Sequence, residues 1–341
     1  ENCRVVVFID DDKSSRLCAG TRTTELQTEL TYHDNICATD SAAMGSVLDY
    51  IFTTYPAEHY GLILWSHASG WIFQNTSDKV KRKYFGIDNG RRSGSLNTGL
   101  RMDIPVLANV LGHCPHLDYI FFDACFMQCV EVAYELRYVA DYIGGSPAEI
   151  PGDGAPYQLL LPALSNSTVP VDRRIADALQ AYSDFYTSGD GYDVYHGVEL
   201  SIIDTSRLGE LLACSLPFLR QMLANRGRPT TEDVQAYCPT SSSSYYTEFI
   251  DMQHLFRNYI NDDAAYSSWL QAFEAAVPVR LLTDQWFTLI GHPHFETLRD
   301  KDNTGGVSVF IPSEYYSNLG WTDSYKQLMW ARDTGFDQTG W

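Results

Sequence analysis

The sequence predicts an α/β protein in which helices alternate with the strands of a mostly parallel sheet. Residues 60–65 are mainly apolar, and residues 119–122 are β-branched or aromatic without a break, as in strands covered on both faces. Apolar residues at helical spacing precede each strand, in residues 44–52 and 102–110. This order of helices and strands is typical of a doubly wound sheet.

At the start of the chain, Arg4 to Ile9 predict an apolar strand that ends at three aspartates, Asp10 to Asp12. These aspartates could bind calcium, although solvated carboxylates in a turn are the simpler interpretation. Residues 17–40 are polar, and we expect a loop there before the first helix.

The sequence downstream of Phe122 continues the alternation of helices and strands. Apolar spacing predicts a helix after Cys125, and the next elements are a strand over 141–145, a helix over 175–182 and a strand over 198–203. Residues 205–302 are dominated by helical patterns instead.

We therefore expect two parts in the chain. The first is an α/β domain over residues 1–204, and the second is a helix-rich subdomain over residues 205–341. In this scheme the apolar segment 307–311 returns to the main sheet as a strand.

The charge of the chain excludes some classes of partner. With 24 basic and 43 acidic residues, the net charge is −19, which argues against nucleic acid or an anionic membrane and is compatible with a cationic substrate. The longest apolar runs are only as long as a strand, so no membrane span or signal peptide is predicted. We expect a monomer that acts on a peptide or protein.

The eight cysteines form no Cys-x-x-Cys pair and no zinc pattern. In an exported protein Cys3, Cys18 and Cys37 could form disulfides, and the pairing stays open. His292 and His294 lack a matched carboxylate or cysteine cluster, so a surface loop is the simpler interpretation. We predict no metal site and no required cofactor, with calcium as an open alternative.

Cys125 lies where an apolar strand turns into a predicted helix. The positive end of a helix dipole would lower the pKa of a thiol there, although a buried structural cysteine is the commoner case. His67 follows the strand over residues 60–65 in the same way. Because reactive groups collect at the carboxyl ends of parallel strands, these residues form a candidate Cys/His pair.

Several segments, in this order, resemble the clostripain family of cysteine peptidases, relatives of the caspases, gingipains and legumains. The resembling segments are Leu62-Ile-Leu-Trp-Ser-His67-Ala-Ser-Gly-Trp71, Phe122-Asp-Ala-Cys125-Phe-Met, Glu131-Val-Ala-Tyr-Glu-Leu-Arg137, residues 145–157 and Gly305-Gly-Val-Ser-Val-Phe-Ile-Pro312. The resemblance implies a caspase-like three-layer sandwich. Family members carry another strand and helix before Arg4, and we expect that this unit was removed or is absent here.

The resemblance also implies peptide hydrolysis through a thioester on Cys125, with His67 as the proton-transferring partner. The backbone N–H groups of Ala68 and Cys125 would hold the oxyanion. Relatives more often have glycine at the position of Ala68, and a requirement for positive φ there would make alanine costly.

A glycine- and proline-rich loop over residues 146–157 predicts part of the substrate site. By resemblance, Asp123 and Asp153 are candidates to bind a substrate Arg or Lys, with Ser146 and Glu149 beside them. A structural role for Asp123, capping the following turn, is an equal alternative.

The most basic run of the chain lies between His67 and Cys125. The resemblance implies a zymogen that is cut at basic residues in this region, which makes Lys79, Lys81, Arg82 and Lys83 candidate self-cleavage sites, with Arg91 and Arg92 behind them. A solvated surface loop is the alternative interpretation.

The sequence thus predicts a cysteine endopeptidase that cuts after Arg or Lys. A catalytically silent, peptide-binding relative is the alternative. We expect export by a bacterium, and because the chain begins at Glu1 without a leader, we expect a processed product.

Overall fold

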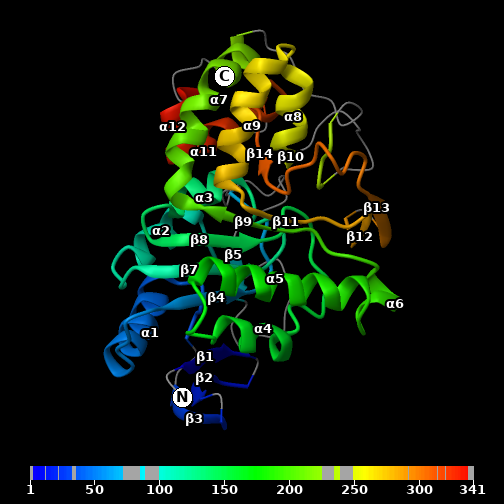
Figure 1. The fold of residues 1–341 in the computed structure, drawn as a ribbon. Helices are drawn as coiled ribbons and strands as arrows, with labels where there is room; N and C mark the ends of the chain where they lie inside the picture. The colour runs from blue at the N-terminus through cyan, green and yellow to red at the C-terminus, as the bar shows by residue number, and fades with distance from the viewer. Residues whose placement is uncertain are drawn as a thin grey trace.

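The computed structural model has a five-stranded mixed sheet at its centre, in the order β11-β9-β8-β7-β4 (Figure 1). Its strands are β4 (Gly61–Trp65), β7 (Leu117–Asp123), β8 (Ala140–Gly145), β9 (Leu200–Asp204) and β11 (Val279–Leu281). The structure describes residues 3–11, 13–21, 23–32, 36–71, 85–88, 100–224, 234–238, 249–290, 292–312, 314–318 and 320–336.

The sheet is less parallel than the sequence predicts. β4, β7 and β8 run parallel, but β9 is antiparallel to β8 and β11 is antiparallel to β9. Two helices that pack on each other, α4 (Tyr157–Leu164) and α5 (Val171–Thr187), connect β8 with β9. A connection with one helix would return the chain parallel to β8. Because α5 follows α4, the chain reverses once more, and β9 runs antiparallel to β8.

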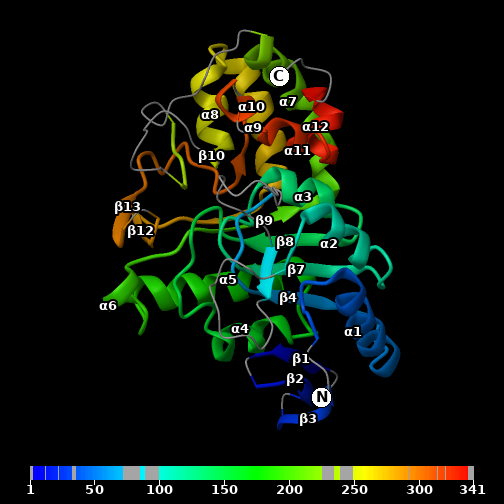
Figure 2. The same cartoon turned by 180° about the vertical axis from the view of Figure 1, so that it is seen from behind.

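Helices cover both faces of this sheet (Figures 1 and 2). On one face lie α1 (Ser41–Thr54), α2 (Ile104–Leu111) and α3 (Val130–Leu136), and on the other lie α4 and α5. Alternation along β7 explains the two cores, because Ile120 and Phe122 join the first and Phe121 joins the second. The predicted α/β architecture is therefore confirmed.

The N-terminal segment forms a separate antiparallel sheet of β1 (Arg4–Asp10), β2 (Ser15–Thr21) and β3 (Thr24–Tyr32). The prediction of a loop over residues 17–40 was wrong for β2 and β3. β3 is polar because its side chains are mostly exposed, so the apolar pattern that identifies a strand is missing. The sheet lies at the opposite end of the molecule from the C-terminal helices (Figure 1).

The C-terminal part is rich in helices, as its sequence predicts. Its helices are α7 (Leu208–Ala224), α8 (Met252–Tyr259), α9 (Asp263–Ala276), α10 (Glu314–Asn318), α11 (Trp321–Tyr325) and α12 (Met329–Thr334). The remaining elements are β5 (Phe85–Asp88), β6 (Leu100–Met102), α6 (Tyr192–Tyr195), the 3-10 turn η1 (Thr205–Arg207), β10 (Ile250–Asp251), β12 (Gln285–Thr288), β13 (His294–Thr297) and β14 (Ser308–Val309). One apolar core runs from the α3 face of the sheet into these helices.

The segment 307–311 does not return to the main sheet, which corrects the prediction. Its strand β14 pairs with β10, while β11 takes the edge position beside β9. The reason is the buried carboxylate of Asp251, which accepts hydrogen bonds from the backbone N–H groups of Gly305 and Gly306, each at 3.0 Å. These bonds hold the turn before β14 against β10.

Helix α3 joins the C-terminal helices to the central sheet through a second buried carboxylate. Glu131 accepts hydrogen bonds from the backbone N–H of Phe310 (2.8 Å) and from the hydroxyl of Tyr325 (3.1 Å). One turn later, Glu135 accepts a bond from the N–H of Met329 at 2.8 Å. Burial raises the pKa of Glu131 to about 7.

The raised pKa of Glu131 predicts that stability falls as the pH rises. A carboxyl group whose pKa is higher in the folded state stabilises the fold fully below its unfolded pKa of 4.5, and this stabilisation is lost as the pH rises through about 7. In Glu131→Gln this dependence should disappear, with a change relative to wild type on the order of 3 kcal/mol between about pH 4 and pH 8.

Urea unfolding at several pH values measures this change. The matched control is Glu210→Gln, which alters an exposed carboxylate on α7 and should keep the pH dependence of the wild type. An unchanged dependence in Glu131→Gln would contradict the assignment.

Candidate active site

His67 and Cys125 follow neighbouring parallel strands at matched positions. The last paired residues of β4 and β7 are Trp65 and Asp123, and each candidate residue lies two positions beyond its strand's member of that pair. Both therefore lie at the carboxyl-end edge of the sheet, where the loop after β8 also begins. This is the edge at which parallel α/β sheets collect reactive groups.

The thiol of Cys125 does not lie at a helix N-terminus, which corrects the sequence prediction. Helix α3 begins at Val130 with Cys129 as its N-cap, so the dipole of this short helix is a turn away from the thiol. Burial, with a smaller contribution from the charges of Glu149 and Asp123, raises the pKa of Cys125 to about 12. A hydrogen bond from the N–H of Ile150 to Sγ of Cys125 (3.4 Å) lowers this pKa. The resting thiol is therefore protonated.

His67 is exposed, and its turn is tied to the short strand β5. Its carbonyl oxygen accepts a hydrogen bond from the N–H of Gly86 at 2.8 Å, and Ala68 pairs with Phe85. Among the described non-glycine residues only Phe126 and His196 have positive φ, so Ala68 carries no backbone penalty. The positive φ in this turn, 69°, falls on Gly70 instead.

Asp123 is a fully buried anchor for the loop over residues 146–157. One carboxylate oxygen accepts hydrogen bonds from the N–H of Ala155 (2.9 Å) and the hydroxyl of Tyr157 (2.6 Å). The other accepts a bond from the hydroxyl of Tyr182 at 3.3 Å. Burial raises the pKa of Asp123, while these bonds lower it. This is a structural role, but the partners lie in the loop over residues 146–157 and in α4 and α5, and not in the turn after Asp123 that the sequence analysis offered as the capped segment.

The loop's other candidate residues lie in three different environments. Ser146 is fully buried, and its hydroxyl donates to the carbonyl of Ala148 at 3.1 Å, so its side chain lies in the turn itself. Glu149 accepts hydrogen bonds from the N–H of Leu289 (2.7 Å) and the hydroxyl of Thr288, which ties the loop to the hairpin of β12 and β13. Asp153 is exposed.

Trp65 is a site residue that the sequence analysis missed. Its side chain is 68% exposed, at the end of the edge strand β4, and Trp65 pairs in register with Asp123. A Cβ atom placed on Gly154 would lie 3.2 Å from Nε1 of Trp65 and 2.9 Å from Oδ2 of Asp123, so Gly154 lies against both side chains. In the sequence, the position of this tryptophan at the carboxyl end of a predicted strand could have indicated a site residue.

Phe126 was also missed. It directly follows Cys125, and its φ of 62° is a left-handed conformation that costs a bulky residue about 1–2 kcal/mol. Its N–H donates to the carbonyl of Ala148 at 3.0 Å, so this group is already bonded and does not face a substrate.

Other predicted features lie away from this edge or outside the described residues. Lys79, Lys81, Arg82 and Lys83 lie outside them, as does Asp12. The carboxylate of Asp11 is bonded to Arg16 at 2.7 Å and to backbone N–H groups of its own turn. All eight cysteines are free thiols, and the described residues contain no group of three or more side chains suited to a metal ion.

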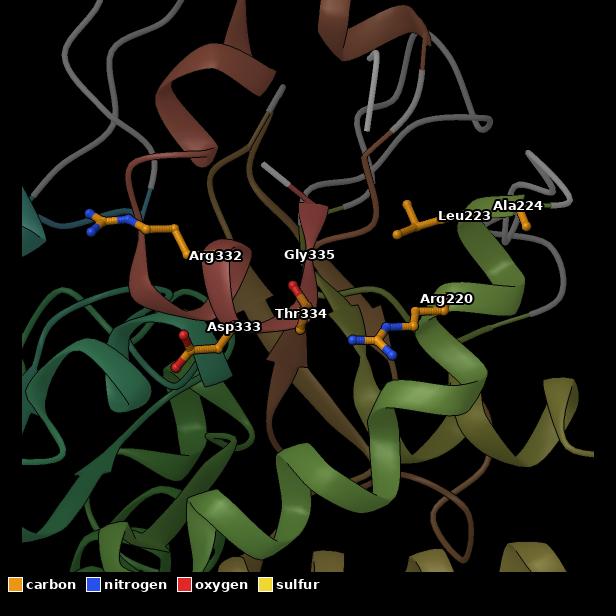
Figure 3. Close-up of a pocket in the computed structure, with 7 residues that line it drawn as sticks. All are labelled: Arg220, Leu223, Ala224, Arg332, Asp333, Thr334 and Gly335. Atoms are coloured by element: carbon orange, nitrogen blue, oxygen red, sulfur yellow. The ribbon is translucent and has the colours of Figure 1, made fainter. Parts of the chain in front are cut away.

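A cavity of about 490 Å³ lies between α7 and α12, at the far end of the C-terminal helices (Figure 3). Arg220 and Leu223 of α7 and Arg332 and Asp333 of α12 are among the residues that line it. It includes none of the candidate site residues, so we do not assign it to catalysis.

Comparisons with known proteins agree with these observations. The model of the clostripain family, Peptidase C11, matches residues 1–341. A secreted C11 cysteine protease from Bacteroides thetaiotaomicron, solved with an irreversible peptide inhibitor, is 28% identical, with a TM-score of 0.81 and 98% of this chain and 89% of that chain covered. A cysteine protease of B. fragilis is 29% identical, with a TM-score of 0.61 and 73% and 99% covered.

An inactive zymogen C11 protease from Parabacteroides distasonis shares the fold, with 22% identity, a TM-score of 0.76 and 97% and 87% of the two chains covered. The comparison with curated protein sequences found no match. In the described part of the chain, no helix combines the length and apolar character that crossing a membrane requires. The structural likeness to C11 proteases implies a caspase-like fold. Since the family model spans the whole sequence, the chain belongs to the clostripain family of cysteine peptidases.

Proposed function

We propose that this peptidase is an endopeptidase that uses Cys125 as nucleophile and His67 as its proton-transferring partner. The observation that carries the proposal is the register of β4 and β7, whose ends bring a thiol and an imidazole to one edge of the sheet. Both residues follow their strands at the same distance, so the two turns that carry them begin side by side.

In the proposed reaction, Sγ of Cys125 attacks the carbonyl carbon of the scissile peptide while its proton passes to His67. His67 then gives this proton to the leaving amine, and the C–N bond breaks to leave a thioester. Water, deprotonated by His67, attacks the thioester and releases the acid and the thiol. The N–H groups of Ala68 and Cys125 would stabilise the oxyanion.

We propose a substrate Arg or Lys at the cleavage site. Asp153 is the exposed carboxylate of the loop, and Glu149 and Asp123 add negative charge close enough to raise the pKa of the nucleophile. A bound cation would offset these charges and so favour the thiolate. The exposed indole of Trp65 offers a face for a guanidinium group.

We also propose export and self-processing. The similar protein from Bacteroides thetaiotaomicron is described as secreted, and that of Parabacteroides distasonis as an inactive zymogen. The basic residues 79–83 lie between His67 and Cys125 and would suit the proposed specificity. No metal enters the proposed reaction, and titration with calcium and with EDTA tests whether calcium supports it.

The first prediction concerns the two catalytic residues. Cys125→Ala and His67→Ala should each lower kcat/KM for a fluorogenic Arg peptide by roughly 10³-fold or more, because each removes a reacting group. The matched controls are Cys214→Ala on α7 and His59→Ala, whose imidazole bonds Asp118 near the start of β7. Equal activity in Cys125→Ala and wild type would disprove the proposal.

A second prediction concerns specificity. Asp153→Asn should lower kcat/KM for Arg and Lys peptides by roughly tenfold and leave any activity on a Leu peptide unchanged, because it removes charge-assisted bonds only. Asp190→Asn, at another exposed acidic residue, is the control. If all three peptides are affected equally, Asp153 does not select the cation.

Self-processing predicts a difference in mass. Incubated wild type should be cut within residues 79–83, whereas Cys125→Ala should stay intact by mass spectrometry. Adding a trace of wild type to the mutant distinguishes cutting within one molecule from cutting between molecules. A wild-type chain that is fully active and uncut would show that no processing is needed.

A further inference from the structure

The residue after the proposed nucleophile holds an unusual backbone conformation. Phe126 has a φ of 62°, which L side chains rarely adopt, and its side chain is only 5% exposed. The backbone conformation of Phe126 sets the path of the chain after β7, and so the position of Cys125. Contacts that hold Phe126 in this conformation therefore also fix the thiol.

The ring of Phe126 stacks on Phe249, a residue from the C-terminal half of the chain. The ring centroids lie 4.8 Å apart with an interplanar angle of 17°, and Phe249 is completely buried. On the other side, the N–H of Phe126 is bonded to Ala148. The strained residue is thus held by one backbone bond and one stacked ring.

Phe249 also packs on the turn that carries His67. A Cβ atom placed on Gly70 would lie 2.6 Å from Cε1 of Phe249 and 2.9 Å from the carbonyl oxygen of Phe126. Gly70 has a φ of 69°, so glycine is required there for both space and conformation. One ring therefore contacts the His67 turn and the Cys125 turn.

The position of Phe249 is itself fixed by the C-terminal part. Its carbonyl oxygen accepts a hydrogen bond from the N–H of Tyr237 at 2.9 Å. The next residue begins β10, whose Asp251 is held by four donors: the hydroxyl of Tyr237 and the N–H groups of His254, Gly305 and Gly306. Phe249 is therefore part of a rigid support behind the two turns.

We propose that Phe249 is a positioning residue that sets His67 and Cys125 relative to each other. The proposal rests on the proposed catalytic pair, and it predicts an effect on the chemical step and little effect on substrate affinity. Phe249 acts through its contacts with Phe126 and Gly70.

Two measurements on purified Phe249→Leu and Phe249→Ala test the proposal. We expect kcat to fall by roughly tenfold or more with KM within about twofold, as when a reacting geometry is displaced and binding is kept. The rate at which iodoacetamide alkylates Cys125 can be followed by mass spectrometry at several pH values. The pH dependence of this rate should be shifted in both variants relative to wild type. Phe249→Leu retains most of the volume and should be less affected than Phe249→Ala.

The matched control is Phe256→Leu. Phe256 is equally buried and stacks on Trp269 at 4.3 Å and 9°, within the pair α8 and α9. We expect a lower Tm with kcat and the alkylation profile unchanged. A wild-type kcat and alkylation profile in both Phe249 variants would overturn the proposal, as would an equal loss of kcat in Phe256→Leu.

Substitutions at Phe126 separate strain from stacking. Phe126→Gly adopts positive φ freely, so it should retain more activity than Phe126→Ala, which keeps the strain and loses the ring. Combining Phe126→Ala with Phe249→Ala should cost little more than Phe249→Ala alone, because that change already removes the contact between the two rings. Additive losses would contradict the pairing.

The alkylation assay also separates this proposal from the proposed function. If wild type cuts no peptide, or if Cys125→Ala is as active as wild type, the catalytic assignment fails, whatever Phe249 does. If the assignment holds and the Phe249 variants behave as wild type, only the positioning role fails.

Discussion

The buried carboxylate of Asp123 is the interaction on which the active-site edge of the sheet depends. It ends β7, and its three hydrogen bonds from Ala155, Tyr157 and Tyr182 fix the loop that follows β8. That loop in turn accepts the N–H of Phe126 and donates to the thiol of Cys125. A desolvated carboxylate is costly unless its oxygens are bonded, so the loop and the strand end are held as one unit.

Buried carboxylates that accept several hydrogen bonds also join the two parts of the chain. Asp251 and Glu131 are completely buried, and each accepts bonds from segments far away in sequence. The C-terminal helices therefore do not form an independent unit: they pack into the core of α3, the helix that follows the nucleophile, and support it from behind. An acidic chain thus uses some of its carboxylates as internal connectors, in addition to those that face water.

The strands and helices that could be predicted from the sequence are those with a local apolar pattern. The strand before Cys125 could be identified because burial on both faces leaves a continuous apolar run, and the strand before His67 is equally apolar although it is only partly buried. The strand β3 was missed because exposed threonines and glutamates replace that run, and β2 was missed because its buried residues include serine, cysteine and glycine, which do not form an apolar run. The pKa of Cys125 could not be predicted, since it depends on burial and on Glu149, and the contact of Phe126 with Phe249 joins residues that no local pattern relates.

The protonated thiol of Cys125 has a consequence for the lifetime of the protein. Oxidants such as peroxide react with thiolates, and a thiol whose pKa is raised to about 12 by burial offers almost none at neutral pH. A cysteine that ionises only as it reacts would therefore escape conversion to sulfenic or sulfinic acid between turnovers.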